Sequence, residues 1–370
     1  MRIVQVCSAI DDFRGGAEQF CFKLSRSLKQ SGYQITLLTG THIRDLSNTL
    51  PITVKTTHTS SNRFARKLCL DYFNPRAIYE LKKIISEFDP NVVHFHSFYG
   101  ISTSLVSIAT QHCPVVITVH DSWLAYIDTV IVTPRFELAN AYYKVIPGLV
   151  HRYINRRLTK NAVLVSPSIW MKDYLASLDY NIPIHINNGI EPTNRKSCYQ
   201  NIIIWVGTLT TFKGLPSVIA SLSHSAEQNN WRFIVIGDGP HKTNLETRYP
   251  NVEFVGYVDP DIYYKQASLL VVSSIGLDNF PTVILEGMRR GICVVGRNKG
   301  GIPEMIQHGS SGMLYDTTTA LVNIVTSLMN NESEIRRIGE TAFQTFNELF
   351  TWESCFRKYL QLYAQMTSDS

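Results

Sequence analysis

The chain has 370 residues, of which 44% are hydrophobic and 18% charged, with a formal net charge of +5. This length is too great for one ordinary core, and the composition is that of a globular enzyme, so we expect two α/β domains of roughly 150 to 200 residues each. No stretch approaches the roughly 20 uninterrupted apolar residues of a membrane-spanning helix, and an acid as early as Asp11 disfavours a secretory signal. We therefore expect the chain to stay in the cytoplasm.

The basic excess lies in the first half of the chain. Residues 1–190 hold 20 Lys and Arg against 13 Asp and Glu, whereas residues 191–370 hold 15 against 17. Basic and aromatic residues mix at residues 62–67 and in the acid-free interval between Glu137 and Asp173. This mixture favours contact with an anionic membrane on its inner face, and the alternative is an ordinary solvated helix face. Nucleic acid is a poorer fit, because no recognised binding module appears.

The cysteines do not predict a disulfide or zinc framework. There are seven, an odd number, and none forms a Cys-x-x-Cys pair. We expect reduced thiols, mostly in the core.

Apolar runs alternate with helical patterns from the first residues, as in parallel sheets. Residues 2–8 predict a buried strand, residues 17–32 an amphipathic helix ended by Gly32, and residues 33–40 the returning strand. These elements predict a doubly wound first domain. Its further strands are expected at residues 91–97, 114–120, 162–168 and 182–189.

The pattern restarts after the polar residues 187–201, which we interpret as an interdomain linker. The domains are therefore predicted at residues 1–187 and 188–350, and the helical residues 351–367 are expected to pack back on the first domain. The strands of the second domain are expected at residues 202–208, 232–239, 252–258, 269–274 and 292–296.

Gly-rich loops follow several of these strands, at residues 14–18, 206–214, 237–240 and 299–304. Loops and helix N-termini at the carboxyl edge of a parallel sheet suit phosphate groups. Each loop alone is weak evidence, because paired glycines more often make a tight turn. A dinucleotide fingerprint starting at Gly237 fails at its third glycine, where Lys242 stands, so we reject NAD.

Nine short motifs occur in a characteristic order, and through them the chain resembles the retaining GT-B glycosyltransferases of family 4 (group 1) over essentially its whole length. That resemblance implies two doubly wound Rossmann-like domains facing across a cleft. The motifs are GGAE at 15–18, TVHDSW at 118–123, SPS at 166–168, NNG at 187–189, FKG at 212–214, GDG at 237–239, VEFVGYV at 252–258, the acid-x7-acid pair Asp278 and Glu286, and GGIPE at 300–304.

The resemblance assigns roles to residues of both domains. Glu286 is expected to accept hydrogen bonds from the nucleotide ribose, Asp278 to reach hydroxyls of the donor sugar, and His120 to lie nearest the reacting carbon. The alternative for Glu286 is an incidental acid on a capped buried helix. The catalytic set is thus His120, Asp278, Glu286 and Lys213. The donor-binding set is Gly15, Gly16, Thr208, Lys213, Asp278, Phe280, Pro281, Thr282, Val283, Ile284 and Glu286.

The acceptor side is less specific. Asp121 and His96 are the expected acceptor residues, although histidines at strand ends, including His94, are more often structural. Thr208 stands where the family has an arginine, and a neutral Thr cannot make the bidentate phosphate contact. Arg297 and Lys299 are candidate compensating cations, unless they simply point to solvent.

The resemblance implies transfer of a sugar from a nucleotide diphosphate sugar to a hydroxyl of a saccharide or lipid-linked saccharide, in bacterial surface polysaccharide or glycolipid synthesis. No metal and no cofactor are expected, since Lys, Arg and helix N-termini hold the leaving diphosphate in such enzymes. The runner-up is a catalytically silent GT-B binding or scaffold subunit of a polysaccharide assembly complex. A third hypothesis, a sugar-nucleotide epimerase, fits the motifs less well.

Overall fold

The structure is a computed structural model that describes residues 1–8, 16–39, 51–53, 72–98, 101–125, 148–194 and 198–368. These residues form two α/β units. Described residues up to Ile186, together with those from Phe356 onward, form unit 1, and Asn187–Cys355 form unit 2. The C-terminal residues thus group with the first unit.

Unit 1 is built on a parallel sheet of seven strands in the order β3-β2-β1-β4-β5-β6-β7. Its central strands carry residues such as Ile3, Val4 and Val93 that are fully buried, which explains their continuous apolar sequence. The strands are β1 (Arg2–Cys7), β2 (Gln34–Thr39), β3 (Pro51–Thr53), β4 (Val92–Phe95), β5 (Val115–Thr118), β6 (Val163–Ser166) and β7 (Ile184–His185).

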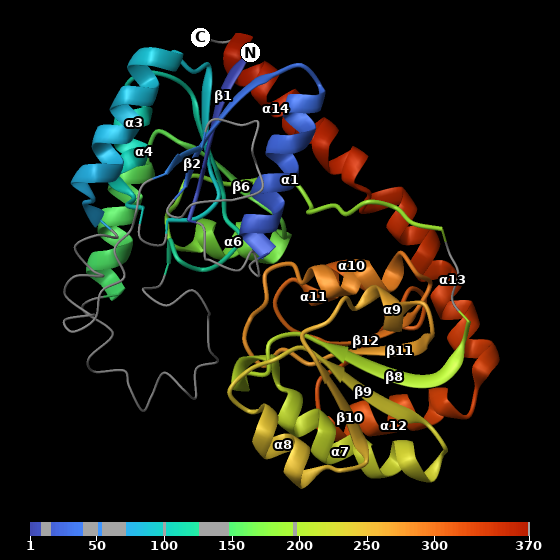
Figure 1. The fold of residues 1–370 in the computed structure, drawn as a ribbon. Helices are drawn as coiled ribbons and strands as arrows, with labels where there is room; N and C mark the ends of the chain where they lie inside the picture. Colours follow the sequence, from blue (N-terminus) through green and yellow to red (C-terminus); the bar gives the residue numbers. More distant parts are fainter. Residues whose placement is uncertain are drawn as a thin grey trace. The chain divides into compact units, whose positions relative to one another are not determined.

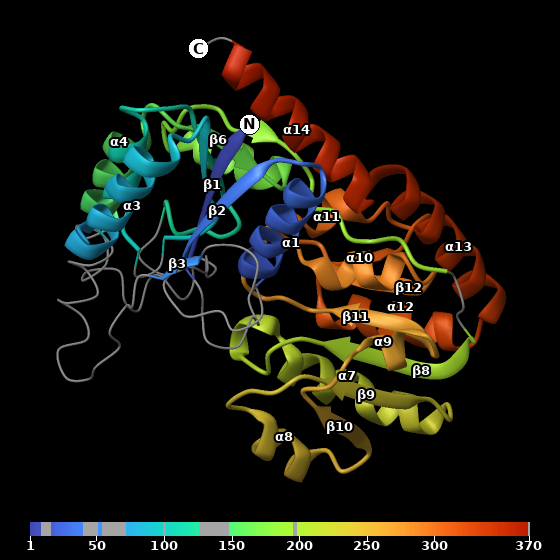
Figure 2. The same cartoon turned by 45° about the horizontal axis from the view of Figure 1, so that its top comes forward.

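Helices cover both faces of this sheet. α1 buries Phe20, Cys21, Leu24 and Leu28 on one stripe, in agreement with the predicted amphipathic pattern. α3 and α4 lie on one side of the sheet, and α1 and the C-terminal part of α14 lie on the other (Figures 1 and 2). The helices are α1 (Gly16–Gln30), α3 (Pro75–Phe88), α4 (Ser104–Ala109), residues 148–159, α6 (Ile169–Ser177) and α14 (Trp352–Ser368).

Unit 2 is built on a parallel sheet of six strands in the order β10-β9-β8-β11-β12-β13. Each interior strand sends alternate residues to two cores, since Ile203 and Trp205 face one and Ile202 and Ile204 the other. The strands are β8 (Gln200–Val206), β9 (Arg232–Ile236), β10 (Val252–Gly256), β11 (Ala267–Val272), β12 (Cys293–Arg297) and β13 (Met313–Tyr315).

The two cores of unit 2 are closed by two layers of helices (Figure 1). α7, α8 and α12 cover the first core, α9, α10 and α11 cover the second, and α13 contributes buried residues to both. The prediction of two doubly wound Rossmann-like domains is confirmed by these sheets. The elements are a 3-10 turn η1 (Thr211–Lys213), α7 (Leu215–Gln228), α8 (Lys242–Arg248), α9 (Asp261–Tyr264), α10 (Thr282–Met288), α11 (Ile302–Met305), α12 (Thr318–Met329) and α13 (Glu332–Leu349).

Two short edge strands, β3 and β13, were not among the predicted elements. Each has only three residues, and β3 begins with a proline, which cannot donate to a sheet ladder. Six cysteines of the described part are free thiols, and Cys69 lies outside the described residues.

Candidate functional site

The loop after β8 brings Lys213 to the carboxyl edge of the second sheet. Gly214, which follows it, has φ +73°, and a Cβ there would lie 2.2 Å from the carbonyl oxygen of Ser273. The Ser273 hydroxyl donates to the Lys213 carbonyl over 2.6 Å and accepts the indole N–H of Trp205 over 2.9 Å. The backbone of Lys213 is therefore held against the end of β11.

Lys213 and Asp278, predicted as parts of one site, lie together. The Lys213 ammonium donates to the two carboxylate oxygens of Asp278 over 2.8 and 3.1 Å. The Ser274 hydroxyl donates to the same carboxylate, and the Gly301 N–H donates to the Asp278 carbonyl over 2.9 Å. The side chains of Lys213 and Asp278 remain 36% and 26% exposed, so a ligand can reach both charges.

Gly300 explains why the GGIPE motif accompanies the acid pair. Its φ is +59°, and a Cβ on it would lie 2.5 Å from the Asp278 carbonyl oxygen. Only glycine fits this close approach between the two loops. The loop after β12 therefore packs against the backbone of Asp278, the first acid of the pair.

Glu286, the second acid, lies on α10. The neighbouring Ile284 and Leu285 are fully buried, whereas Glu286 is half-buried. Burial raises the pKa of the Glu286 carboxyl, and the Tyr264 hydroxyl and the Arg289 charge oppose part of that rise. The apolar residues between the two acids anchor the helix, as the sequence predicts.

Phe280 and Ile284, both in the predicted donor-binding set, place their side chains in the core of unit 2. The ring of Phe280 packs edge-on against Phe350 with 5.8 Å between centroids. Only the backbone of these two residues is left to meet a ligand. Pro281 precedes the first turn of α10, where Thr282 and Val283 are half-buried.

Thr208 lies in the loop after β8 and Arg297 is the last residue of β12, so both stand at the carboxyl edge of the second sheet. Thr208 is exposed. Lys299 lies close to Arg297, since burial and the charge of Arg297 lower the pKa of Lys299. The buried Nε of Arg297 has no hydrogen-bond partner within the described part of the chain. The role of Arg297 and Lys299 as compensating cations stays a prediction.

In unit 1, His96 follows β4, and His120 and Asp121 follow β5. The two imidazoles approach to 3.3 Å between Nδ1 of His96 and Nε2 of His120. Burial lowers the pKa of His120 to about 3 and raises that of Asp121 to about 6, and the Asp121 carboxylate accepts the Trp123 N–H over 2.9 Å. Both histidines are neutral at physiological pH.

Gly16, from the predicted donor-binding set, is the exposed first residue of α1. Gly15 lies outside the described residues.

We expect His94→Gln to weaken the acid sensitivity of the protein. Burial holds the pKa of His94 well below its ordinary value. Below about pH 6.5, His94 therefore binds a proton in the unfolded chain but stays neutral in the native state. Each such histidine destabilises the fold by up to about 1.4 kcal/mol per pH unit as the pH falls. Asp121, with its raised pKa, acts in the opposite direction below about pH 6.

Urea unfolding of wild type and His94→Gln at intervals from pH 7 to 5 tests this. The variant should lose less free energy of unfolding than wild type over that range, and the exposed His224→Gln serves as the matched control with the wild-type slope. Identical pH slopes for His94→Gln and wild type would contradict the expectation.

Several residues near the predicted site were missed by the sequence analysis. Gln5 could have been noticed because it is a polar residue inside an apolar strand. Tyr359 and Tyr363 could have been noticed because they form an i, i+4 pair on the terminal helix. Ser274 and Tyr264 carried no signal, because only the fold brings them to the two acids. Gln5, Tyr359 and Tyr363 all hydrogen-bond to the histidine and threonine side chains at the ends of β4 and β5 in unit 1.

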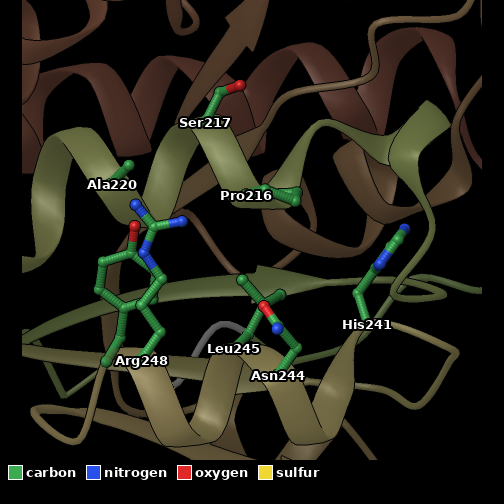
Figure 3. A pocket seen from close by; sticks show the side chains of 8 residues that line it. Pro216, Ser217, Ala220, His241, Asn244, Leu245 and Arg248 are labelled. Atoms are coloured by element: carbon green, nitrogen blue, oxygen red, sulfur yellow. The ribbon is translucent and has the colours of Figure 1, made fainter.

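A cavity of about 400 Å³ lies between α7 and α8, away from the predicted residues (Figure 3). Pro216 and Ser217 line it from α7, and Leu245 and Arg248 from α8. Among the residues that the structure describes, no group of three or more His, Cys, Asp or Glu is placed to hold a metal ion. Within the same residues, no helix is both long and apolar enough to cross a membrane.

Comparison with known proteins agrees with this geometry. Residues 14–194 match Glycosyltransferase Family 4, and residues 190–345 match Glycosyl transferases group 1. Two Rossmann-like units with these matches define a GT-B glycosyltransferase. The chain belongs to the group 1 and family 4 glycosyltransferases, as its motifs predict.

Individual relatives are distant. The chain is 27% identical over 183 residues to N-acetyl-alpha-D-glucosaminyl L-malate synthase of Bacillus anthracis, which covers 46% of this chain and 47% of that protein. It is 21% identical over 393 aligned residues to O-antigen chain mannosyltransferase C of Escherichia coli, covering 99% of each. The chain spans about half the length of the curated relatives that it matches over shorter segments.

Among solved structures, sucrose-phosphate synthase of Thermosynechococcus elongatus has a TM-score of 0.81 at 18% identity and covers 100% of both chains. At that identity the likeness shows the GT-B fold alone.

Proposed function

We propose that this chain transfers a sugar from a nucleotide diphosphate sugar to an acceptor hydroxyl with retention at the anomeric carbon. The observation that carries the proposal is the cluster of Lys213, Ser274 and Asp278, with Glu286 eight residues further on. The cation of Lys213 suits a phosphate group. The partly exposed carboxylate of Asp278 and the second acid, Glu286 on the following helix, each suit a set of sugar hydroxyls. The names of two relatives, O-antigen chain mannosyltransferase C and phosphatidyl-myo-inositol mannosyltransferase, support bacterial polysaccharide or glycolipid synthesis as the setting.

The three proposed site residues of unit 2, Lys213, Asp278 and Glu286, each have a distinct role in this proposal. Lys213 turns from Asp278 toward the leaving diphosphate, and Asp278 then accepts hydrogen bonds from hydroxyls of the donor sugar. Glu286 accepts from the ribose hydroxyls. Burial and the nearby acids Asp261 and Asp259 raise the pKa of Glu286, and the Tyr264 hydroxyl and the Arg289 charge oppose that rise.

The reaction breaks the bond between the anomeric carbon and the diphosphate oxygen and forms a bond to the acceptor oxygen on the same face. The proton of the acceptor hydroxyl passes to the leaving diphosphate. Stabilising the charge that develops on that diphosphate is the main catalytic contribution of the protein, worth several kcal/mol. Lys213, with Arg297 and Lys299, supplies positive charge for this purpose, so the proposal needs no metal ion.

A thermal-shift panel of UDP, GDP and ADP tests the donor site and identifies the base. A nucleotide present at about 100 times its Kd should stabilise the protein by roughly 2.7 kcal/mol. We expect one of the three to raise the unfolding temperature of unit 2 at concentrations where the others do not. No shift with any of them up to millimolar concentration would argue against a nucleotide site.

We also propose that unit 1 contacts an anionic membrane through the helix at residues 148–159 and the adjacent Lys160. This helix exposes apolar residues beside basic ones, as an interfacial helix does. Lys144 and the rest of the basic segment before residue 148 lie outside the described residues. The exposed set is Leu149, Val150, Tyr153, Arg156, Arg157 and Lys160.

We expect the protein to float with vesicles of phosphatidylserine and phosphatidylcholine at low salt and to be released at about 0.5 M salt, where the Debye length falls below about 5 Å. The double variant Arg157→Ser with Lys160→Ser should bind less, since each basic residue near the surface contributes about 1 kcal/mol. Arg232→Ser with Lys265→Ser, two exposed cations of unit 2, is the matched control. Binding that is absent, or unchanged by salt, contradicts this proposal.

A further inference from the structure

A continuous chain of buried hydrogen bonds runs through unit 1 from α14 to His120. Its members come from the ends of three neighbouring strands and from one face of the helix. Gln5, His94 and His96 are buried, and Tyr359 and Tyr363 lie one helical turn apart with rings that are fully buried. Such a chain is costly to bury unless every group is paired, so its geometry fixes which atom carries each proton.

The amide of Gln5 sets the direction of the chain, because its two ends differ chemically. Its oxygen lies 2.6 Å from Nε2 of His96, and its nitrogen lies 3.4 Å from the hydroxyl of Tyr363. The oxygen accepts, so His96 carries its proton on Nε2. The nitrogen donates, so the Tyr363 hydroxyl accepts from Gln5 and can donate its own proton to His94.

This assignment for Gln5 sets the proton positions on two branches of the chain, one through Tyr363 and His94 and the other through His96 and His120. The Tyr363 hydroxyl donates to Nδ1 of His94 over 2.6 Å, and Nε2 of His94 donates to the Thr118 hydroxyl over 2.8 Å. On the other branch, Nδ1 of His96 accepts a hydrogen bond from the Nε2–H of His120 over 3.3 Å. His120 is thereby left with an unprotonated Nδ1.

Ring packing holds the imidazoles in these orientations. The rings of His94 and His96 lie 4.0 Å apart, and Phe20 packs against His120 with 5.1 Å between centroids. Burial keeps the pKa of each of the three histidines low, so none carries a second proton that would reverse a bond. The hydroxyls and neutral imidazoles of the chain can each donate or accept, so its direction follows from the two ends of the Gln5 amide.

We propose that Tyr363, Gln5 and His96 are positioning residues that hold His120 as the Nε2-protonated tautomer, with Nδ1 as an acceptor for a hydroxyl group of the substrate. The contact with substrate rests on the proposed function, whereas the tautomer does not. A hydroxyl-bearing sugar meets this requirement, because a hydroxyl can donate to a bare imidazole nitrogen. The C-terminal helix thus acts on the site through a hydrogen-bonded chain.

The tautomers can be measured without any activity assay. In protein labelled with ¹⁵N-histidine, long-range ¹H–¹⁵N correlation spectra at pH 7.5 distinguish Nε2-protonated from Nδ1-protonated rings, and His94→Gln, His96→Gln and His120→Gln assign the signals. We expect the Nε2-protonated form at all three positions. An Nδ1-protonated His120, which a reversed Gln5 amide would give, overturns the proposal.

Tyr363→Phe and Tyr359→Phe form a matched pair on one helix. Tyr363→Phe removes the hydroxyl to which the Gln5 amide nitrogen donates, so the amide is no longer held in one orientation and His96 and His120 should become mixtures of tautomers. Tyr359→Phe removes only the hydroxyl beyond Thr118, with which it shares a 2.9 Å contact, so the His120 signal should stay as in wild type. Unchanged tautomers in Tyr363→Phe would overturn the positioning role.

Kinetics separate this proposal from the proposed function. With a donor in hand, Tyr363→Phe should lower kcat/KM about tenfold, the scale of one hydrogen bond, while Tyr359→Phe stays within about twofold. If the tautomers are as expected but His120→Ala retains full activity, the substrate contact of His120 is wrong. If no donor is turned over, the proposed function fails and the spectra still decide the tautomer.

Discussion

Lys213→Ala should lower kcat/KM for sugar transfer by about 10²- to 10³-fold. This corresponds to about 3 to 4 kcal/mol in transition-state stabilisation, the effect of removing one preorganised donor from a developing anion. A diphosphate leaving group carries about two negative charges, and a helix N-terminus offsets only roughly half a charge. If Thr208 stands at the position of a second cation, as the family resemblance implies, Lys213 should matter more here than in enzymes that have both.

The fold should survive this substitution. Lys213 pairs with Asp278, but both side chains are partly exposed, and such pairs stabilise by about 1 kcal/mol or less. The matched control is Arg232→Ala, which removes a cation from an exposed ion pair with Glu253 at the opposite edge of the same sheet. That variant should keep wild-type kinetics. A Lys213→Ala enzyme as active as wild type would mean that the phosphate lies elsewhere.

The same charge balance assigns a role to Arg297 and Lys299. Burial, and after it the charge of Arg297, lowers the pKa of Lys299, and we propose that an anion bound beside the two side chains favours both charges. Arg297→Ala should therefore lower activity measurably, and Thr208→Arg should tighten binding of the nucleotide diphosphate or leave it unchanged. Wild-type behaviour of both Arg297→Ala and Lys299→Ala would exclude this compensation.

Glu286→Ala should weaken nucleotide affinity by about 1.5 to 3 kcal/mol, the range for hydrogen bonds to a charged group, or roughly tenfold to 150-fold in Kd. The fold should remain intact, since the neighbours Ile284 and Leu285 supply the buried surface of α10. Isothermal titration with the nucleotide found in the thermal-shift panel measures the loss. Glu253→Ala, which removes a carboxylate from the far edge of the sheet, is the control and should bind as wild type does.

Sequence reasoning recovered the sheets because their strands are buried on both faces and therefore appear as continuous apolar runs. It failed on β3 and β13, where three residues are too few to form a pattern. Asp278, Glu286 and Lys213 could be proposed as site residues of the second unit because they stand in local motifs. Their pairing could not be predicted, because Lys213 and Asp278 are 65 residues apart and only the fold sets their distance.

The contacts around His120 lay further beyond sequence reasoning. His94 meets the Tyr363 hydroxyl across 269 positions, and no local pattern reports such a contact. Phe280 shows the opposite limit, since its motif predicts a donor-binding residue while its ring packs in the core against Phe350. A motif residue serves either the path of the backbone or the chemistry of its side chain, and a single sequence does not distinguish these two roles.

The most direct test of the central claim incubates the protein with radiolabelled UDP-, GDP- and ADP-sugars and saccharide or lipid-linked acceptors, with Lys213→Ala in parallel. We expect transfer, or slow hydrolysis, of at least one donor by the wild type and a loss of about 10²-fold or more in Lys213→Ala. No turnover of any donor by the wild type would contradict it and favour a catalytically silent binding subunit.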